Sequence, residues 1–202
     1  MNDITYIVTG DGPRCGSSMM MECLQAGGIR LEFDEDCNNS IKRANWDEPT
    51  SNPHGYFEIT MENQFNMGFP LALRFSGKAI KVFPPPWGGL LRIIPGNYKI
   101  IWMHRKYEDR WNSYFKFHYG AVLDWGQMNN QSFMQYRDAR ATETLEIMKL
   151  RSDCDVIEMQ YDRILQTPQE AFEFLAADNY PIDPKLSASI VNSNMQHFKK
   201  AV

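Results

Sequence analysis

The chain lacks the features that would place it among nucleic-acid-binding or membrane proteins. Its 202 residues carry 21 Lys and Arg against 25 Asp and Glu, so the formal net charge is -4 and no broad basic surface is expected to attract nucleic acid. No apolar run approaches the roughly 20 residues of a membrane-spanning helix, and no basic segment of a secretory signal opens the chain. We therefore expect a soluble, cytoplasmic protein with no membrane span and no nucleic-acid partner.

Cysteine and histidine are scarce and irregularly spaced. The four cysteines form no Cys-x-x-Cys pair, and the four histidines are scattered, so no zinc-binding spacing is present and no metal site is expected. Free thiols in a reducing compartment are the simpler interpretation. Cys15 lies in a glycine-rich loop, where a small side chain that fills a tight turn is a better interpretation than a nucleophile.

The composition is that of an ordinary globular protein, with 43% hydrophobic and 23% charged residues. At about 150 residues per domain, the length predicts one domain over residues 1–202. Residues 32–55 lack sustained periodicity and are expected to form a long loop or lid.

Short apolar runs alternate with longer segments of helical periodicity. Strands are expected at residues 4–9, 79–83, 98–103 and 155–159, and helices at 17–26, 106–118, 132–151, 168–177 and 184–194. This alternation is typical of an α/β fold whose helices cover a parallel sheet, here of about four to five strands.

A glycine-rich turn follows the first expected strand. Residues 9–18 read TGDGPRCGSS and lead directly into the first expected helix. Glycines let backbone N–H groups approach an anion, the helix amino terminus adds unsatisfied donors, and Ser17 and Ser18 add hydroxyl groups. Arg14 supplies a balancing positive charge. A strand-to-helix connector without any ligand has the same outline, so a second element is needed to decide.

The turn departs from the Walker A sequence of nucleotide kinases. GxxxxGK[ST] requires a lysine after its second glycine, whereas Ser17 follows Gly16, and the cation Arg14 precedes that glycine by two residues. This departure disfavours a P-loop nucleotide or nucleoside kinase, which we keep as an alternative.

A second cationic element follows the strand expected at residues 98–103. Arg105 comes at its carboxyl end, where open α/β sheets bind ligands, and Ser113 lies eight residues later. A cation at this position favours direct phosphate binding over the Mg²⁺ binding of a kinase. The alternative is a surface arginine and an exposed serine.

Together the two elements resemble the sulfotransferases that use 3′-phosphoadenosine-5′-phosphosulfate (PAPS). Pro13, Arg14, Cys15, Gly16, Ser17 and Ser18 are similar to the family loop that binds the 5′-phosphosulfate, with Cys15 where a serine is usual. Arg105 and Ser113 match the Arg and Ser pair that binds the 3′-phosphate. Residues 52–58, 80–84 and 160–168 are also similar to family segments. The resemblance is to short bacterial-type members and covers residues 4–180.

The resemblance implies a P-loop-type three-layer αβα fold and a metal-independent, in-line transfer of the sulfuryl group from PAPS to a small-molecule, glycan or lipid hydroxyl. The family's Arg-Lys-Gly segment near the carboxyl terminus, which completes the 3′-phosphate site, is missing, and Lys199 and Lys200 are speculative substitutes. A non-catalytic nucleotide-binding protein of the same fold is the main alternative.

Sulfuryl transfer needs groups that stabilise the leaving charge and a base that takes the proton of the acceptor. The loop N–H groups, Ser17, Ser18 and Arg14 are expected to stabilise the charge on the leaving 5′-phosphate oxygen. The acceptor hydroxyl loses a proton as its bond to sulfur forms. Phe83 occupies the position of the family's catalytic histidine, so no histidine base is carried over at this site. Some family members use a glutamate as the base, and the resemblance therefore makes Glu58 the expected base, with His54 as the alternative. Glu58 as a mere partner of a helix amino terminus is the other interpretation. Lys81 is expected to contact the bridging or acceptor oxygen, unless its ammonium reaches solvent.

One further residue is carried over from the family. Tyr161 is expected to stack on the adenine or contact its edge, as the similar family tyrosine does, and a packed core tyrosine is the alternative.

Overall fold

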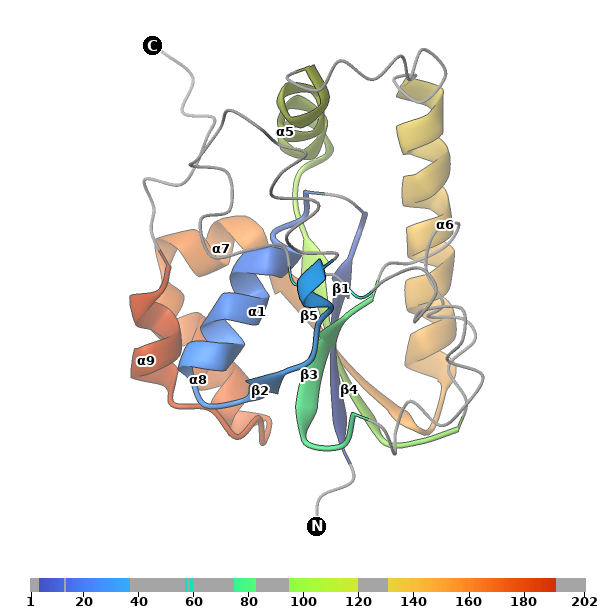
Figure 1. Ribbon diagram of the computed structural model, residues 1–202. Helices are drawn as coiled ribbons and strands as arrows, with labels where there is room; N and C mark the ends of the chain where they lie inside the picture. The colour runs from blue at the N-terminus through green and yellow to red at the C-terminus, as the bar shows by residue number, and fades with distance from the viewer. Residues whose placement is uncertain are drawn as a thin grey trace.

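A parallel sheet with helices on both faces forms the centre of the computed structural model (Figure 1). The structure describes residues 4–12, 14–36, 57, 59, 75–82, 95–119 and 131–191, with only the course of the helix at 114–119 and 131–134. The strands are β1 (Thr5–Gly10), β2 (Arg30–Leu31), β3 (Lys78–Lys81), β4 (Tyr98–His104) and β5 (Cys154–Gln160). The helices are α1 (Ser17–Ala26), α5 (Tyr107–Tyr119), α6 (Gln131–Leu150), α7 (Tyr161–Gln166), α8 (Pro168–Ala177) and α9 (Pro184–Ser189).

The five strands lie in the order β2-β3-β1-β4-β5, and every neighbouring pair is parallel. The expected α/β class and the three layers are thereby confirmed. The sequence patterns also predict β1, β3, β4 and β5, and the helices α1, α5, α6 and α8, with ends that differ by no more than two residues.

Two elements were not expected, and one helix was predicted too long. β2 has only two residues, so it shows no periodicity. α7 begins at Tyr161 directly after β5, with no turn residue to mark its start. The helix expected at 184–194 is wrong at its end, since α9 stops at Ser189. The Ser189 hydroxyl donates to the Leu186 carbonyl oxygen over 2.7 Å, a local side-chain bond typical of helix ends.

Alternating residues of the central strands pack in two separate hydrophobic cores, one on each face of the sheet. Tyr6 and Val8 of β1 pack in one cluster with α1, α7 and α8, whereas Ile7 packs in a second cluster with α6 on the opposite face (Figure 1). β4 repeats the pattern, with Ile101 in the first cluster and Trp102 in the second. This is the two-residue period of a strand that is buried on both faces.

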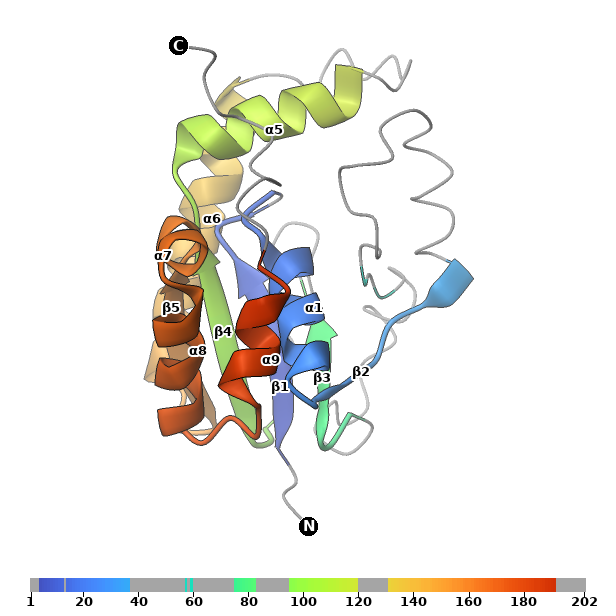
Figure 2. The ribbon, with the colours of Figure 1, turned by 90° about the vertical axis from the view of Figure 1, so that its left-hand side faces the viewer.

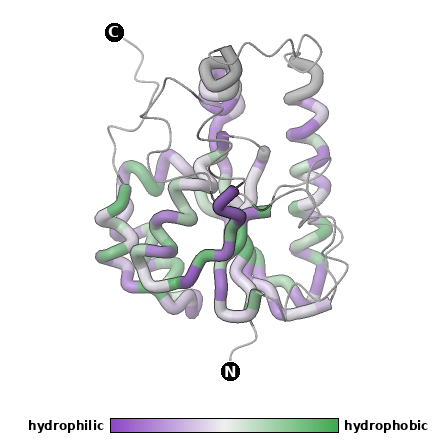
Figure 3. The backbone as a smooth tube through the Cα atoms, viewed as in Figure 1, coloured by the Kyte–Doolittle hydropathy of each residue, from purple (hydrophilic) through white to green (hydrophobic). Residues whose placement is uncertain are grey.

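Helix α5 has a different place from the other helices. Figure 2 shows it lying across the end of the sheet toward which β1 and β4 point, rather than along a face. In the coloured part of α6 in Figure 3, hydrophilic and hydrophobic residues alternate, and Ala141, Leu145 and Met148 of this helix pack in the second cluster. Among the described helices, none combines the length and the apolarity needed to cross a bilayer.

The order of the strands singles out one position at the carboxyl ends of the strands. From β1 the chain continues through α1 to β2 on one side, and from β4 it continues through α5 and α6 to β5 on the other side. The neighbouring carboxyl ends of β1 and β4 are therefore a topological switch point, where open α/β sheets bind their ligands. The loop at residues 10–16 and the segment at 104–106 both start there.

Candidate functional site

The two cationic segments identified in the sequence lie in contact at this switch point. The Nε atom of Arg14 donates a hydrogen bond to the Oγ atom of Ser113 over 2.9 Å. The Nη1 atom of Arg105 donates to the carbonyl oxygen of Arg14 over 3.0 Å. The loop after β1, the end of β4 and the helix α5 thus place two guanidinium groups and a hydroxyl in one site.

The loop backbone adopts left-handed conformations. Gly12 has a φ of 139° and Gly16 a φ of 97°. A Cβ atom on Gly16 would lie 2.3 Å from the Cδ2 atom of Tyr161, so only glycine fits there. Arg14 has a φ of 67°, a left-handed conformation that costs a residue with a side chain roughly 1–2 kcal/mol. Such strain persists where surrounding contacts hold the backbone, as Arg105 holds the Arg14 carbonyl.

A lysine from β3 contacts the first turn of helix α1. Gly16 caps α1, and Ser17 and Ser18 are its first two residues. The Nζ atom of Lys81 donates to the Oγ atom of Ser18 over 3.1 Å, and the residue is only 2% exposed. The alternative of an ammonium group extending into solvent is therefore wrong, because Lys81 is enclosed beside the loop.

Tyr161 lies between the loop and Arg105. The Cζ atom of Arg105 stands 4.4 Å from the centroid of the tyrosine ring, a cation–π contact. The ring itself is 8% exposed and belongs to the core cluster on the α1 face. Burial raises the pKa of its hydroxyl. The interpretation as a packed core tyrosine describes these contacts, and the expected contact with an adenine stays a prediction.

Three buried polar atoms at this edge of the sheet have no hydrogen-bond partner within the described part of the chain. They are the Oγ1 atom of Thr9, the Nε atom of Arg105 and the hydroxyl of Tyr107. A buried donor left without a partner costs about 1–3 kcal/mol, more when it is charged. The Nε atom of Arg105 belongs to the site itself, and an unpaired charged donor there fits a ligand that carries phosphate or sulfate oxygens.

The sequence reasoning missed a hydrogen-bond network around Asp11. Its carboxylate accepts from the Nε1 atom of Trp102 over 3.1 Å and from the backbone N–H of Arg105 over 3.3 Å. It also lies 2.8 Å from the Nδ1 atom of His104. Burial raises the pKa of Asp11, but the bonds from His104 and Trp102 and the charge of Arg110 outweigh it, so the net direction is down.

His104 is held between two carboxylates. Its Nδ1 atom faces Asp11, and its Nε2 atom lies 2.8 Å from the Oε2 atom of Glu158. The hydrogen bond to Asp11 contributes most to raising the pKa of His104. Because an acceptor lies at each ring nitrogen, the protonated imidazolium is favoured over the neutral ring. Glu158 is 54 residues away in the sequence, and no local pattern indicates the pairing.

The remaining residues singled out in the sequence are either buried in the loop or outside the described part of the chain. Cys15 is 1% exposed and burial raises the pKa of its thiol, so it fills the loop as expected. Pro13, His54 and Glu58 lie outside the described residues, and so do Phe83, Lys199 and Lys200. Within the described ranges, no three His, Cys, Asp or Glu side chains gather where they could hold a metal ion.

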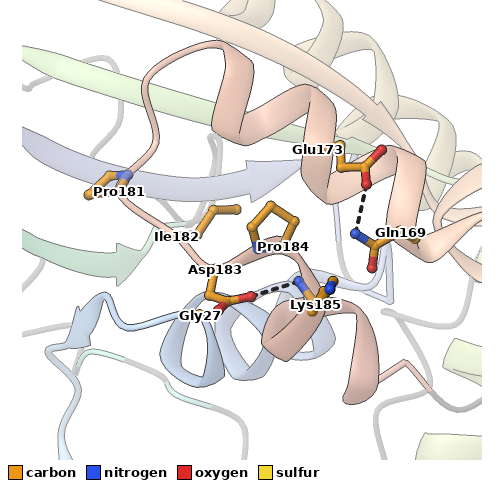
Figure 4. A pocket seen from close by; sticks show the side chains of 8 residues that line it. All are labelled: Gly27, Gln169, Glu173, Pro181, Ile182, Asp183, Pro184 and Lys185. Carbon is orange, nitrogen blue, oxygen red and sulfur yellow. Dashed lines mark hydrogen bonds between the residues drawn. The ribbon is translucent and has the colours of Figure 1, made fainter.

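A groove of about 680 Å³ lies elsewhere on the molecule, between α1, α8 and α9 (Figure 4). It is lined by Gly27, Gln169, Glu173, Pro181, Ile182, Asp183, Pro184 and Lys185. Its amide and carboxylate groups have partners, since Gln169 donates to Glu173 and Asp183 accepts from the backbone of Lys185. Gly27 follows the last residue of α1, about 15 Å along the helix from the loop, so the groove is a separate feature.

A scan against models of known protein families found no match to this chain, and a search of curated proteins found none either. The site is therefore interpreted from its own chemistry. Two arginines, one buried lysine and the amino terminus of α1 surround a loop of backbone N–H groups, and this set can bind a multiply charged anion and stabilise negative charge that develops on it.

Proposed function

We propose that this protein is a sulfotransferase that moves the sulfuryl group of PAPS to a hydroxyl acceptor. The observation that carries the proposal is the contact between the loop after β1 and the Arg105–Ser113 pair. Arg14 lies 2.9 Å from Ser113, and Arg105 lies 3.0 Å from the carbonyl oxygen of Arg14. A single PAPS molecule carries a 5′-phosphosulfate and a 3′-phosphate on one ribose, so its two binding segments must be neighbours. In this proposal the sheet is of the P-loop type, with residues 10–16 as the phosphate loop.

The loop side of the site would bind the 5′-phosphosulfate. Ser17, Ser18 and the N–H groups at the start of α1 would donate to its oxygens. Arg14 and the enclosed Lys81 would place two positive charges where the leaving oxygen becomes negative. Arg105, with its buried Nε atom and no described partner for it, would bind the 3′-phosphate together with Ser113.

The transfer would be an in-line displacement without a covalent enzyme intermediate. The acceptor oxygen forms a bond to sulfur while the bond from sulfur to the bridging phosphate oxygen breaks. The electron pair of the broken bond stays on that oxygen, which leaves as adenosine 3′,5′-bisphosphate. The protein's contribution is to align the two partners and to stabilise the leaving charge, and no metal ion is needed for it.

The proton of the acceptor hydroxyl goes to a base. Glu58, with His54 as the alternative, stays the predicted base, and both lie outside the described residues. The acceptor is a small-molecule, glycan or lipid hydroxyl. A non-catalytic nucleotide-binding protein would share the donor site and would show binding without turnover.

The test is a calorimetric titration of adenosine 3′,5′-bisphosphate in the presence of EDTA, beside a titration of ATP with Mg²⁺. We expect metal-independent binding that Arg105→Ala weakens about tenfold or more, since a charged hydrogen-bond partner is lost. The matched control is Arg140→Ala, a half-buried arginine of α6 that pairs with Glu143. Absence of bisphosphate binding, or a preference for ATP with Mg²⁺, would overturn the proposal and favour a kinase or a ligand-free turn.

A further inference from the structure

Arg110 lies beneath the site, on the first turns of α5. It follows Arg105 by five residues and is only 2% exposed. Its Nε atom donates to the carbonyl oxygen of Arg105 over 3.1 Å. Its Nη1 atom donates to the carbonyl oxygen of Asp11 over 3.2 Å. One guanidinium group therefore holds the backbone of both segments that make up the site.

A carboxylate from another helix fixes this guanidinium. Both terminal nitrogens of Arg110 donate to Asp138 of α6, the Nη1 atom to the Oδ1 atom over 2.9 Å and the Nη2 atom to the Oδ2 atom. Such a two-pronged pair defines the plane of the guanidinium as well as its position. A buried cation needs a partner of this kind, because burial without one is costly.

The contacts of Arg110 differ from the other contacts between the two segments. Arg14, Arg105 and Ser113 bind each other through the same donor groups that an anion would engage, so a bound anion competes with those bonds. Arg110 ends on two carbonyl oxygens and a carboxylate. All three guanidinium nitrogens of Arg110 already donate to these protein oxygens, so a bound anion does not have to displace the Arg110 contacts.

The hydrogen bonds to carbonyl oxygens also orient the peptide units. In a trans peptide the N–H points opposite to the C=O. The N–H groups of Gly12 and Lys106, which share peptide units with the two bonded carbonyls, therefore point away from Arg110. A Cβ atom on Gly12 would lie 3.4 Å from the Nη1 atom of Arg110, so the guanidinium packs closely on the loop.

We infer that Arg110, paired with Asp138, is a positioning residue that holds the loop at residues 10–16 and the segment at 104–106 at the separation that one donor molecule spans. This inference rests on the proposed function for the identity of the donor. The contacts of Arg110 with the two segments are a property of the protein itself, so their role can be tested without a ligand.

The binding test uses Arg110→Lys, which keeps the positive charge and loses the planar fork of donors. The matched control is Arg151→Lys. Arg151 also forms a two-pronged pair, from its Nε and Nη2 atoms to the carboxylate of Asp153 at 2.9 and 2.7 Å, in the turn before β5 at the amino ends of the strands. We expect Arg110→Lys to weaken binding of adenosine 3′,5′-bisphosphate about tenfold or more, and Arg151→Lys by less than about twofold.

A purely structural role would appear differently. Both variants would then lower the thermal midpoint and leave the affinity for the bisphosphate alike, which would overturn the inference. Asp138→Asn provides a second variant, since it weakens the hold on Arg110 without removing the guanidinium. It should lower the affinity in the same direction by a smaller factor.

The ligand-free test is amide hydrogen exchange. The N–H of Asp11 donates to the Met103 carbonyl over 3.1 Å, and the N–H of Arg105 donates to the Asp11 carboxylate over 3.3 Å. Both amides should exchange faster in Arg110→Lys than in the unmodified protein. In Arg151→Lys their exchange rates should equal those of the unmodified protein. Equal exchange in both variants would overturn the inference. If the unmodified protein fails to bind the bisphosphate, the proposed function fails, and the exchange rates still decide the role of Arg110.

Discussion

The Nε atom of Arg14 lies 2.9 Å from the Oγ atom of Ser113, across 99 positions of the sequence. The contact follows from the sheet. β1 and β4 are parallel neighbours, and their register places Gly10 opposite Met103. The loop that leaves β1 and the helix that follows β4 therefore start at the same edge. Two cationic segments far apart in the sequence become one site because two central strands pair.

Gly16→Ala tests the close approach of the loop to Tyr161. A Cβ atom there would lie 2.3 Å from the Cδ2 atom of the tyrosine, in addition to the strain of a φ of 97°. Gly28→Ala is the control, because Gly28 has a φ of 108° and no atom within 4 Å of a Cβ. We expect Gly16→Ala to lose about 1–3 kcal/mol more unfolding free energy than the control, measured by urea denaturation. Equal losses would show that only the backbone conformation matters.

Lys81→Met tests the enclosed cation beside the loop. Methionine keeps the length of the side chain and removes the charge that lies 3.1 Å from the Ser18 hydroxyl. Binding of adenosine 3′,5′-bisphosphate should weaken about tenfold or more in a calorimetric titration. Lys78→Met on the same strand is the control, since Lys78 is half-exposed and pairs with Glu32. A similar affinity in both variants would remove Lys81 from the donor site.

His104→Asn tests the charge at the end of β4 through the pH dependence of stability. The pKa of His104 is raised, foremost by its hydrogen bond to Asp11. Its stabilising contribution is therefore complete below the pKa of an unfolded histidine, about 6.5, and is lost as pH rises through the higher folded pKa. Urea denaturation should show that the unmodified protein exceeds the variant most in mildly acidic buffer and progressively less in alkaline buffer.

The carboxylates that face His104 do not reverse this trend. The pKa values of Asp11 and Glu158 are lowered, so their contributions are complete above the unfolded carboxyl values, about 4, and are lost only as pH falls below them. Lys149 also pairs with Glu158, at 2.7 Å, and that bond raises the pKa of the lysine, so its charge is kept in the range where His104 titrates. A stability difference that does not change with pH would contradict the charged state of His104.

Glu58→Gln tests the predicted base. If Glu58 takes the proton of the acceptor hydroxyl, turnover should fall roughly 100-fold while the affinity for adenosine 3′,5′-bisphosphate is kept. The measurement is product formation from PAPS with an acceptor chosen by a screen of phenols, sugars and lipids. His54→Gln is the parallel variant. Unchanged turnover in Glu58→Gln with a loss in His54→Gln would move the base to His54.

Local patterns were sufficient for most of the fold. β1 and β4 are short apolar runs bounded by turn residues, and α1 ends before two glycines, so each carries its own signal. β2 and α7 carry none, because two residues have no period and Tyr161 follows Gln160 without a break. Tertiary pairing decides such short elements.

The candidate site was predictable only where its residues belong to a motif. Arg14, Arg105 and Ser113 were identified by spacing, and the structure brings all three together. Arg110 was not, although it lies between Arg105 and Ser113 in the sequence. Its role depends on Asp138, which is 28 residues away on another helix, and on carbonyl groups that every residue possesses. No pattern of residue types in the sequence predicts contacts of this kind.

The central place of β1 has a consequence for how the chain folds. Its partners are residues 79–81 of β3 and 98–103 of β4, so each pairing closes a loop of dozens of residues. Contacts of such long range form slowly. During synthesis β1 can pair with β3 first, but its glycine-rich loop meets the Arg105 segment only after β4 has emerged from the ribosome. The contact between this loop and Arg105 should therefore be among the last features to mature, and under the proposed function binding of adenosine 3′,5′-bisphosphate would report that this part of the sheet has folded.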